Sequence, residues 1–276
     1  MNNQKKEIFI KAFTVIELLL VIAIIGLISS IVFVSLKSAR KRAQITKALQ
    51  WSTSLNHLLG AEAAGIWNFD GGSGNTASDL SGYHNDGTIY GASWTKETPS
   101  EQGYALKFEG GQYVEIGDVK SLQITGDQTI AMWLYPFAFD ARRNPYAKAY
   151  GGEGTITQEI SGTLTYYYGT CGGNCFPYQG FGMGKSLDLN TWNHVAVVRD
   201  LSVGKLYWYK NGELVSQVNA SYSQAATSSL PARIGRGYVS DYYGIIDDVV
   251  IYSQALPTSE IQKIYVKGLS CHLVKN

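Results

Sequence analysis

The chain has little net charge, few histidines and few cysteines, and each shortage excludes a class of function. Its 23 Lys and Arg residues against 22 Asp and Glu residues give a formal net charge of +1, so no overall field favours nucleic acid or an acidic partner. The 4 histidines include no metal-binding pair, and the 3 cysteines lack the second cysteine pair of a structural zinc site. We therefore expect no nucleic-acid partner.

Two hydrolase signatures are also missing. Glycoside hydrolases need two placed carboxylates, commonly from one strand that reads Glu-x-Asp-x-x-Glu, whereas Glu115, Asp247 and Asp248 stand isolated. No Gly-x-Ser-x-Gly nucleophile elbow occurs either. We expect a protein that is not an enzyme, and a glycan-processing activity is the least favoured alternative.

An apolar run dominates the N-terminal part of the chain. From residue 15 to residue 36 nearly every residue is Leu, Ile, Val, Ala or Phe, and about 20 such residues in a helix cross a hydrocarbon core. Glu17 is the exception, because a carboxylate in lipid costs at least a few kcal/mol unless it has a partner or a function. Either Glu17 lies near the interface and reaches the headgroups, or it pairs with another group. The run predicts a membrane anchor.

The residues around the start of this run form an ordered motif. Lys5 and Lys6 precede the sequence KAFTVIE at residues 11–17, and the apolar residues follow. This resembles the prepilin leader and N-terminal helix of type IV pilins and type II secretion pseudopilins. The resemblance implies cleavage by prepilin peptidase between Ala12 and Phe13, N-methylation of Phe13, and pairing of Glu17 with the N-terminal amine of a neighbouring pilin or pseudopilin subunit. Ala12 stands where the family mostly has glycine.

The resemblance also implies a leader at residues 1–12, a transmembrane helix at 13–36 and an amphipathic helix at 37–60. Two other interpretations of this segment are open. One is a secretory signal peptide, although residues 33–39 offer only a poor cleavage site. The other is a plain signal anchor. Five cations follow the span at positions 37, 40, 41, 42 and 47, and the positive-inside rule alone leans against a cytoplasmic N-terminus. The leader nevertheless implies a single-pass cytoplasmic-membrane protein with its head outside, displayed after assembly on the cell surface or a pilus.

Beyond residue 64, short runs rich in Val, Ile, Tyr, Trp and Thr alternate with clusters of Gly, Asn, Asp and Ser. Such runs predict strands, here at residues 65–69, 104–108, 113–116, 128–136, 155–160, 164–168, 192–199, 205–210, 214–219, 232–235 and 244–252. Lys-Asn-Gly-Glu at residues 210–213 predicts a type I′ hairpin turn. A helix near residues 259–265 is expected, with Thr258 or Ser259 as its cap and Glu260 in its first turn. The pattern predicts a mainly β, antiparallel two-sheet jelly-roll sandwich.

Several segments of this head recur in a fixed order. They are WNFD at 67–70, DLSGYHNDGTI at 79–89, ALKFEG at 105–110, YVEI at 113–116, TIAMWL at 129–134, WNHVAVVRD at 192–200, LYWYKNGE at 206–213, IGR at 234–236, IDDVVIY at 246–252 and ALPTSEI at 255–261. Together they resemble the concanavalin A-like, laminin G-like domains of bacterial surface proteins. The resemblance implies a sandwich over residues 64–267, followed by a tail at 268–276.

The same resemblance implies a structural calcium ion. Members of the family often hold calcium with the aspartate of this glycine-bearing loop, loop carbonyls and the first aspartate of the Ile-Asp-Asp-Val strand. The matching residues are Asp79, Asn85 and Asp247. The alternative is turn chemistry, since Asp, Asn and Gly favour turns for their own reasons, and calcium takes six to eight oxygen ligands.

The cysteines and histidines suggest structural roles. Cys171 and Cys175 lie in a glycine-rich stretch and could close a small disulfide loop, as suits an oxidising exterior, or they could be free thiols. Cys271 would then be unpaired or intermolecular. His194 lies in a predicted strand, where a core or pairing role is expected.

Aromatic side chains offer a binding role, because their rings stack on sugar faces and tyrosine adds a polar tip. Ten tyrosines gather in the middle and late head, although strands favour aromatics in any case: Tyr146, Tyr150, Tyr166, Tyr167, Tyr168, Tyr178, Tyr222, Tyr238, Tyr242 and Tyr243. Two hypotheses follow. The chain is a minor or tip-located pilin-like subunit whose head adheres to a glycan or protein, or it is a pseudopilin of a secretion or DNA-uptake machine with a mainly structural head.

Overall fold

The structure is a computed structural model that describes residues 16, 19–20, 22, 24 and 63–269. It divides into two units, Met1–Ala48 and Leu49–Asn276. The described residues of the first unit are helical, and their side chains are exposed: Ile16, Leu19, Leu20, Ile22 and Ile24. Within the described ranges, no helix is long and apolar enough to span a bilayer.

The leader and its functional residues lie outside the described part of the chain. This applies to the predicted cleavage site between Ala12 and Phe13, and to the predicted assembly residue Glu17. The transmembrane and amphipathic helices at 13–36 and 37–60 also fall largely or wholly outside it. These features therefore stay predictions.

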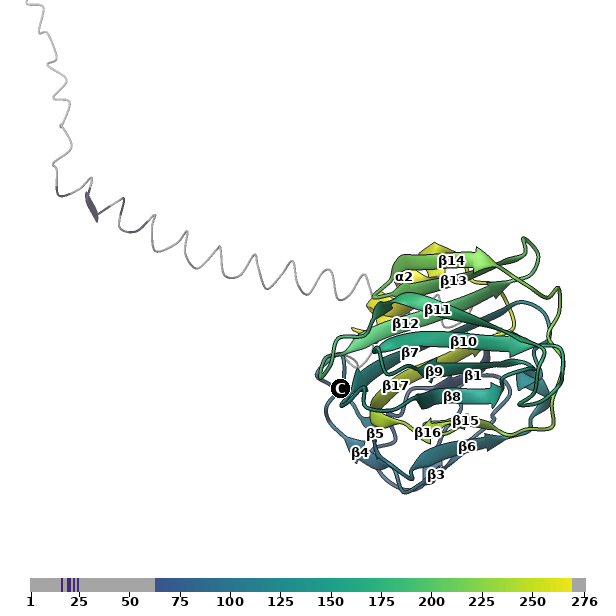
Figure 1. Cartoon of the computed structure of the whole chain (residues 1–276). Coiled ribbons are helices and arrows are strands. Elements are labelled where there is room, and N and C mark those ends of the chain that lie inside the picture. The colour runs from purple at the N-terminus through teal and green to yellow at the C-terminus, as the bar shows by residue number, and fades with distance from the viewer. Residues whose placement is uncertain (1–15, 17–18, 21, 23, 25–62, 270–276) are drawn as a thin grey trace, which may run out of the picture. The chain divides into compact units, whose positions relative to one another are not determined.

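The second unit is a two-sheet sandwich, as the strand pattern predicts (Figure 1). The first sheet has the order β14-β13-β12-β7-β17-β5-β4, with β1 also paired to β17. Its strands are β1 (Ala63–Trp67), β4 (Ser93–Thr95), β5 (Ala105–Glu109), β7 (Gln128–Pro136), β12 (Asn193–Asp200), β13 (Lys205–Lys210), β14 (Glu213–Asn219) and β17 (Tyr243–Tyr252).

The second sheet faces the first and has the order β11-β10-β9-β8-β15-β6-β3-β2. A short strand, β16, pairs with β8 in parallel, whereas the other described pairings of this sheet are antiparallel. The strands are β2 (Thr76–Ala77), β3 (Gly87–Tyr90), β6 (Tyr113–Gly117), β8 (Arg143–Ala149), β9 (Gly154–Gln158), β10 (Thr163–Gly169), β11 (Tyr178–Ser186), β15 (Ala232–Ile234) and β16 (Ser240–Asp241).

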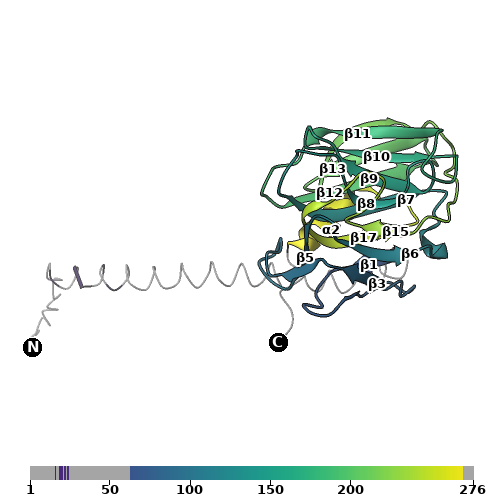
Figure 2. The same ribbon diagram turned by 60° about the horizontal axis from the view of Figure 1, so that its bottom comes forward.

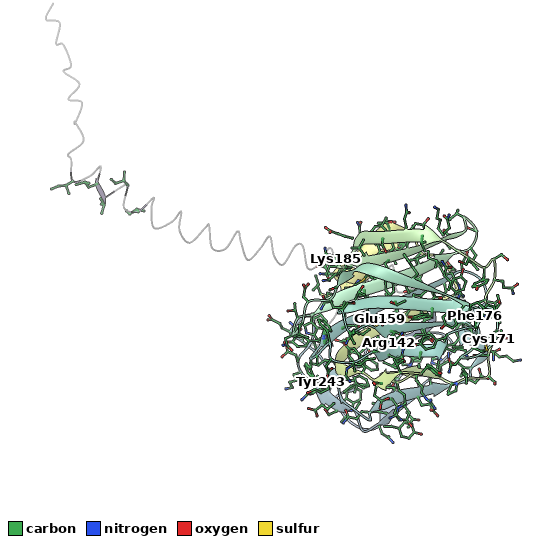
Figure 3. All side chains as sticks on the ribbon, in the orientation of Figure 1. Arg142, Glu159, Cys171, Phe176, Lys185 and Tyr243 are labelled. Carbon is green, nitrogen blue, oxygen red and sulfur yellow. A yellow bond between two sulfur atoms is a disulfide. The ribbon has the colours of Figure 1, made fainter. Side chains whose placement is uncertain are left out.

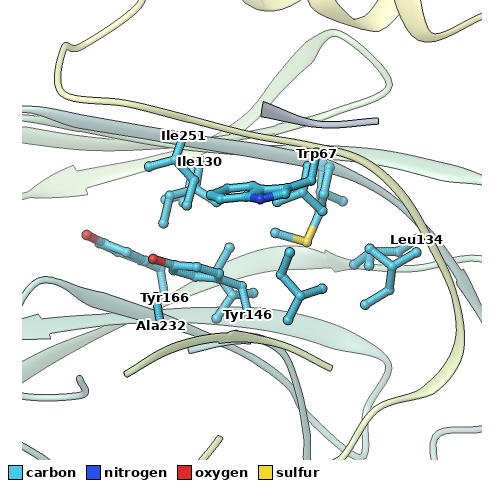
Figure 4. Packing of buried hydrophobic residues seen from close by; sticks show 14 of the residues in the cluster. Trp67, Ile130, Leu134, Tyr146, Tyr166, Ala232 and Ile251 are labelled. Carbon is cyan, nitrogen blue, oxygen red and sulfur yellow. The ribbon is translucent and has the colours of Figure 1, made fainter. Parts of the chain in front are cut away.

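The main core fills the space between the sheets. Along β7, Ile130, Met132 and Leu134 point into it at alternate positions, as the two-residue period of a strand requires, and each is completely buried. Figure 4 shows Trp67 and Ile130 from the first sheet opposite Tyr146 and Tyr166 from the second. Full burial of such side chains stabilises the fold by roughly 1.5–3 kcal/mol each.

A smaller cluster lies on the outer face of the first sheet, under helix α2 (Thr258–Gly268) (Figure 2). Ile261 of the helix packs there with Ala131 and Ala196. The predicted helix is confirmed, but the prediction of its cap is wrong. Pro257 occupies the N-cap position without a side-chain cap, and the hydroxyl of Thr258 instead lies 3.0 Å from the Tyr209 hydroxyl.

Strands β7 and β13 have the predicted bounds, and the hairpin turn is confirmed because Asn211 and Gly212 both have positive φ. Strands β8 and β11 were not predicted. The first contains Pro145 and Lys148, which usually argue against an interior strand, and glycines alternate with larger residues in the second. Strands β2, β3, β4 and β16 and the 3-10 helix η1 (Lys120–Leu122) were not predicted either.

His194 occupies the core position that the sequence predicts for it. Its side chain is buried against Trp133 and Tyr265, with ring centroids 5.2 and 5.6 Å away. Neither ring nitrogen has a hydrogen-bond partner within the described part of the chain. Burial lowers the pKa of this histidine to about 3, so the folded protein holds it neutral.

This burial predicts a defined acid sensitivity. Below pH 6.5 the unfolded chain protonates His194 while the folded chain does not, so the unfolding free energy falls as the pH drops towards 3, by up to about 1.4 kcal/mol per pH unit. We expect His194→Leu to remove this component, measured by urea unfolding from pH 7 to pH 4. The exposed His84 supplies the control, because His84→Asn also removes a histidine but should keep the component of the pH profile that is due to the buried His194. An unchanged profile in His194→Leu would contradict the assignment.

Candidate functional site

A row of five residues crosses the outer face of the second sheet. Strand pairing places them opposite one another in the order Glu115, Arg233, Ala147, Thr155 and Tyr167. Residues directly opposite each other in paired strands share one face. On each strand, the residue next to the row in sequence points into the core. These residues are Val114, Ile234, Tyr146, Ile156 and Tyr166. The row therefore faces outward.

Aromatic rings gather at the Tyr167 end of this row. We call Tyr150, Tyr167, Phe176, Tyr178 and Tyr238 the aromatic patch. Tyr150 is central, with ring centroids 4.7 Å from Tyr167, 6.2 Å from Tyr178 and 5.6 Å from Tyr238. Tyr178 continues the contacts to Phe176 at 6.1 Å. The central ring is 6% exposed, whereas Phe176 is 79% and Tyr238 68% exposed, so the outer rings of the patch present open faces to solvent.

Tyr150 is fixed by polar contacts beneath the patch. Its hydroxyl lies 2.7 Å from the Thr157 hydroxyl and accepts a hydrogen bond from Asn144 Nδ2 at 3.3 Å. Its backbone N–H donates to Asn174 Oδ1 at 3.2 Å. These contacts hold the central ring in one orientation, and the exposed rings pack around it.

The predicted cysteine pair forms a disulfide beside the patch. Cys171 and Cys175 are bonded, with Cα atoms 5.9 Å apart. The N–H groups of Cys171 and Gly172 donate to the carbonyl of Gly151, and Gly151 N–H donates to Gly173. A Cβ on Gly151 would overlap the Cys175 carbonyl oxygen. The disulfide loop is thus seated on the residue that follows Tyr150, and the chain continues from it directly into Phe176. Cys271 lies outside the described residues.

An ion pair borders the patch (Figure 3). Arg142 Nε and Nη2 donate to the two carboxylate oxygens of Glu159 at 2.7 and 3.2 Å. Arg142 Nη2 also donates to the Tyr167 hydroxyl at 3.0 Å. Burial and the neighbouring Glu159 carboxylate raise the pKa of Tyr167 to about 12, so this tyrosine stays a neutral hydrogen-bonding group.

A small pocket of about 60 Å³ adjoins Tyr238. Its lining comprises Ala147, Lys148, Asn174, Leu230, Pro231, Arg233, Arg236, Gly237 and Tyr238. The guanidinium groups of Arg233 and Arg236 lie over the Tyr113 ring, 5.6 and 3.9 Å from its centroid. Open aromatic faces, a small pocket of mixed lining and planar ion pairs together suit a ligand that carries both apolar faces and hydroxyl groups.

Eight of the ten tyrosines fall into two groups, whereas Tyr222 and Tyr243 are partly buried and belong to neither. Tyr146, Tyr166, Tyr168 and Tyr242 belong to the core. Tyr167, Tyr178 and Tyr238 reach the surface, around Tyr150. The sequence alone singles out none of these tyrosines as a site, and it gives no signal for Phe176, Arg142 or Glu159. Alternation along residues 166–168 could have identified the middle tyrosine as the outward one.

The predicted calcium residues have different surroundings. The Asp79 carboxylate accepts four hydrogen bonds, from Ile66 N–H, from the N–H and hydroxyl of Ser81 and from Asn85 N–H, at 2.7–2.8 Å. A carboxylate offers about four lone-pair positions. A calcium ion at Asp79 would therefore displace one of these donors, and the arrangement as it stands fits turn chemistry.

Asn85 and Asp247 add little to an ion site in this arrangement. Asn85 Nδ2 donates to the Ala64 carbonyl and to the Ser121 hydroxyl. Asp247 is completely buried in β17, and burial, followed by the charge of Asp248, raises the pKa of its carboxyl well above the usual range. Within the described ranges, no group of three or more His, Cys, Asp or Glu side chains is placed to hold a metal ion. Calcium stays a prediction from the family resemblance.

Comparison with known proteins identifies the family of the head. Residues 108–262, more than half of the chain, match the family model described as the concanavalin A-like lectin/glucanases superfamily. The chain belongs to this superfamily. No curated protein matches the sequence.

Solved structures of low sequence identity share the fold of this superfamily member. Domain 4 of the arabinanase AbnA from Geobacillus stearothermophilus, in complex with arabinotriose, is similar with a TM-score of 0.59 and 18% identity, over 74% of this chain and 98% of that one. The binding domain of botulinum neurotoxin DC, in complex with SialylT, is similar with a TM-score of 0.58 and 15% identity, over 76% of this chain. The chain spans about half of that binding domain, 52%.

The contacts of Asp79 predict the effect of its removal. Asp79→Ala leaves three backbone N–H groups and one hydroxyl without their acceptor, and we expect a loss of at least about 2 kcal/mol in unfolding free energy. The loss should be the same with calcium and with excess chelator, because the four donors belong to the protein. Asp140→Ala, which removes only an exposed partner of Arg143, should cost less than about 1 kcal/mol. A loss confined to calcium-containing buffer would instead identify Asp79 as an ion ligand.

Proposed function

We propose that the head binds a glycan through the aromatic patch. The observation that carries this proposal is the cluster of open rings, Phe176, Tyr178 and Tyr238, packed around the fixed ring of Tyr150. Exposed aromatic faces lose contact with water when a sugar ring covers them, and tyrosine hydroxyls and the nearby ion pair can exchange hydrogen bonds with its hydroxyl groups. The neighbouring pocket has room for a single small substituent.

Two similar structures support this choice of ligand. The arabinanase domain was solved with arabinotriose, and the neurotoxin binding domain with SialylT. The likeness extends to the fold, and their ligands suggest the class of molecule that this head takes.

We further propose that the chain is a pilin-like surface subunit, minor or tip-located, that displays this head for adhesion. The support is the ordered leader motif from Lys11 to Glu17 and the apolar run that follows it. A head of about 200 residues would crowd a dense filament, since domains of 100–150 residues are commoner. A pseudopilin with a mainly structural head is the alternative, and glycan binding by the head is the property that distinguishes the two.

Glycan binding depends on the open rings of the patch. We expect the full chain, purified in mild detergent, to bind oligosaccharides on a glycan array, and Phe176→Ala and Tyr238→Ala each to weaken this binding about tenfold, which corresponds to about 1.4 kcal/mol. Tyr83→Ala is the matched control, because Tyr83 is also a strongly exposed tyrosine, at 59%, in a loop that contributes nothing to the patch. Absence of any glycan signal, or equal loss in all three variants, would contradict the proposal.

Assembly depends on Glu17. We expect Glu17→Ala to leave membrane insertion intact and to abolish incorporation into filaments, because the proposed partner of the carboxylate is the N-terminal amine of a neighbouring subunit. Fractionation and immunogold labelling of cells measure the two steps separately. Glu7→Ala, in the segment that the peptidase would remove, should assemble as the parent does. Filament display that survives Glu17→Ala would refute the assembly role.

A further inference from the structure

The charged side chains around the aromatic patch and its pocket are paired with opposite charges. Arg142 pairs with Glu159 and Arg233 with Glu115, each at 2.7 Å. Arg236 pairs with Asp241 at 2.7 Å. Each guanidinium places two of its nitrogens against its partner carboxylate. This geometry fixes the orientation of both planar groups.

The positive charge of Lys148, the remaining cation of the pocket, is also balanced by neighbouring carboxylates. Lys148 has a completely buried side chain, and its Nζ donates to Asp118 Oδ1 and to the Leu230 carbonyl, each at 2.9 Å. Glu153 Oε1 lies 3.6 Å from the same nitrogen. Two carboxylates, Asp118 and Glu153, therefore lie within ion-pair distance of one buried ammonium group. Because Lys148 is buried and its charge is compensated, it offers no unbalanced positive charge to a ligand.

Paired charges of this kind disfavour an anionic ligand. A sialic acid, uronate or sulfate group that approached Arg142 or Arg233 would come within a few ångströms of the carboxylate already bound there, and like charges at that separation repel. Capture of an anion would need that carboxylate to be displaced, which breaks the charge-assisted hydrogen bonds that the guanidinium already makes to it. A sugar hydroxyl meets neither cost, because it can donate to a carboxylate and accept from a guanidinium at the same time.

The extent of the site bears on the size of the ligand. The row from Glu115 to Tyr167 crosses strands β6, β15, β8, β9 and β10, and four spacings between neighbouring strands amount to about 19 Å. The Arg233–Glu115 pair stands at one end of this row, and the open rings stand at the other end together with the Arg142–Glu159 pair. Ala147 and Thr155 in the middle of the row are buried, so a ligand can reach the two ends of the row, and one that contacts both ends needs several sugar rings.

We infer that the ligand of this face is an uncharged oligosaccharide. The inference rests on the proposed glycan-binding function and adds the charge class and the length of the ligand to it. The pairs Arg142–Glu159, Arg233–Glu115 and Arg236–Asp241 select against anionic glycans by cancelling the positive charge that would attract them.

The first experiment compares matched glycans. The full chain in mild detergent is applied to an array that carries neutral oligosaccharides of one to six sugars and the same oligosaccharides with a terminal sialic acid or sulfate. We expect neutral chains to bind, longer ones more tightly than monosaccharides, and their anionic counterparts to bind at least about tenfold more weakly. Tighter binding of the anionic forms overturns the inference but leaves the proposed function standing. Absence of binding to every glycan overturns both.

The second experiment changes the charge of the face. Glu159→Gln removes the partner of Arg142 with little change of shape, and we expect the ratio of anionic to neutral binding to rise at least about fivefold, and the gain to disappear at high salt. Glu115→Gln, which frees Arg233, should act in the same direction and serves if the first variant unfolds. Glu109→Gln frees Lys107 in the other sheet and should leave the ratio unchanged. An unchanged ratio in folded Glu159→Gln and Glu115→Gln contradicts the inference.

Discussion

The buried guanidinium of Arg199 joins the two sheets, and much of the head depends on it. Arg199 lies in β12 of the first sheet, and its side chain donates to the carbonyls of Ile124, Gly126 and Glu153 and to the hydroxyl of Tyr166 in the second sheet. A buried cation is tolerated only when its donors are satisfied, so these acceptors must keep their places. The segment that ends at Glu153 begins beside Tyr150, and the position of the central ring of the aromatic patch therefore follows from a contact within the core.

The fold could be predicted where the local pattern and the tertiary environment agree. The apolar run of β7 and the Asn-Gly turn at residues 211–212 are such places, because strand and turn preferences there match the final structure. Strand β8 is the opposite case. Its Pro145 and Lys148 oppose a strand when they are taken alone, but the buried lysine finds Asp118 and the Leu230 carbonyl, both distant in sequence. Compensation by distant partners cannot be seen in a local window.

The candidate site shows the same limit. The aromatic patch combines residues from 150 to 238 that meet only because β8, β9, β10 and β11 pair in one register and a disulfide loop folds back on Gly151. The tyrosines could be found in the sequence. Their burial could not, and so the sequence does not distinguish Tyr238 on the surface from Tyr242 in the core. The Lys11–Glu17 motif differs, because its resemblance to a prepilin leader rests on adjacent residues. A resemblance of this kind needs no knowledge of the tertiary structure, so it can be recognised from the sequence alone.

The proposed glycan recognition gives the ion pairs of the outer face a role that stability does not. A solvent-exposed pair such as Arg142–Glu159 contributes only about 0–1 kcal/mol to folding, a small amount beside the core or the contacts of Arg199. Such pairs do hold planar groups in fixed orientations next to open rings, and they set the charge that a ligand meets. Because they carry so little of the stability, they can change without loss of the fold. The same sandwich can thus present a neutral or a charged face, and the choice of ligand lies in a few surface residues and not in the architecture.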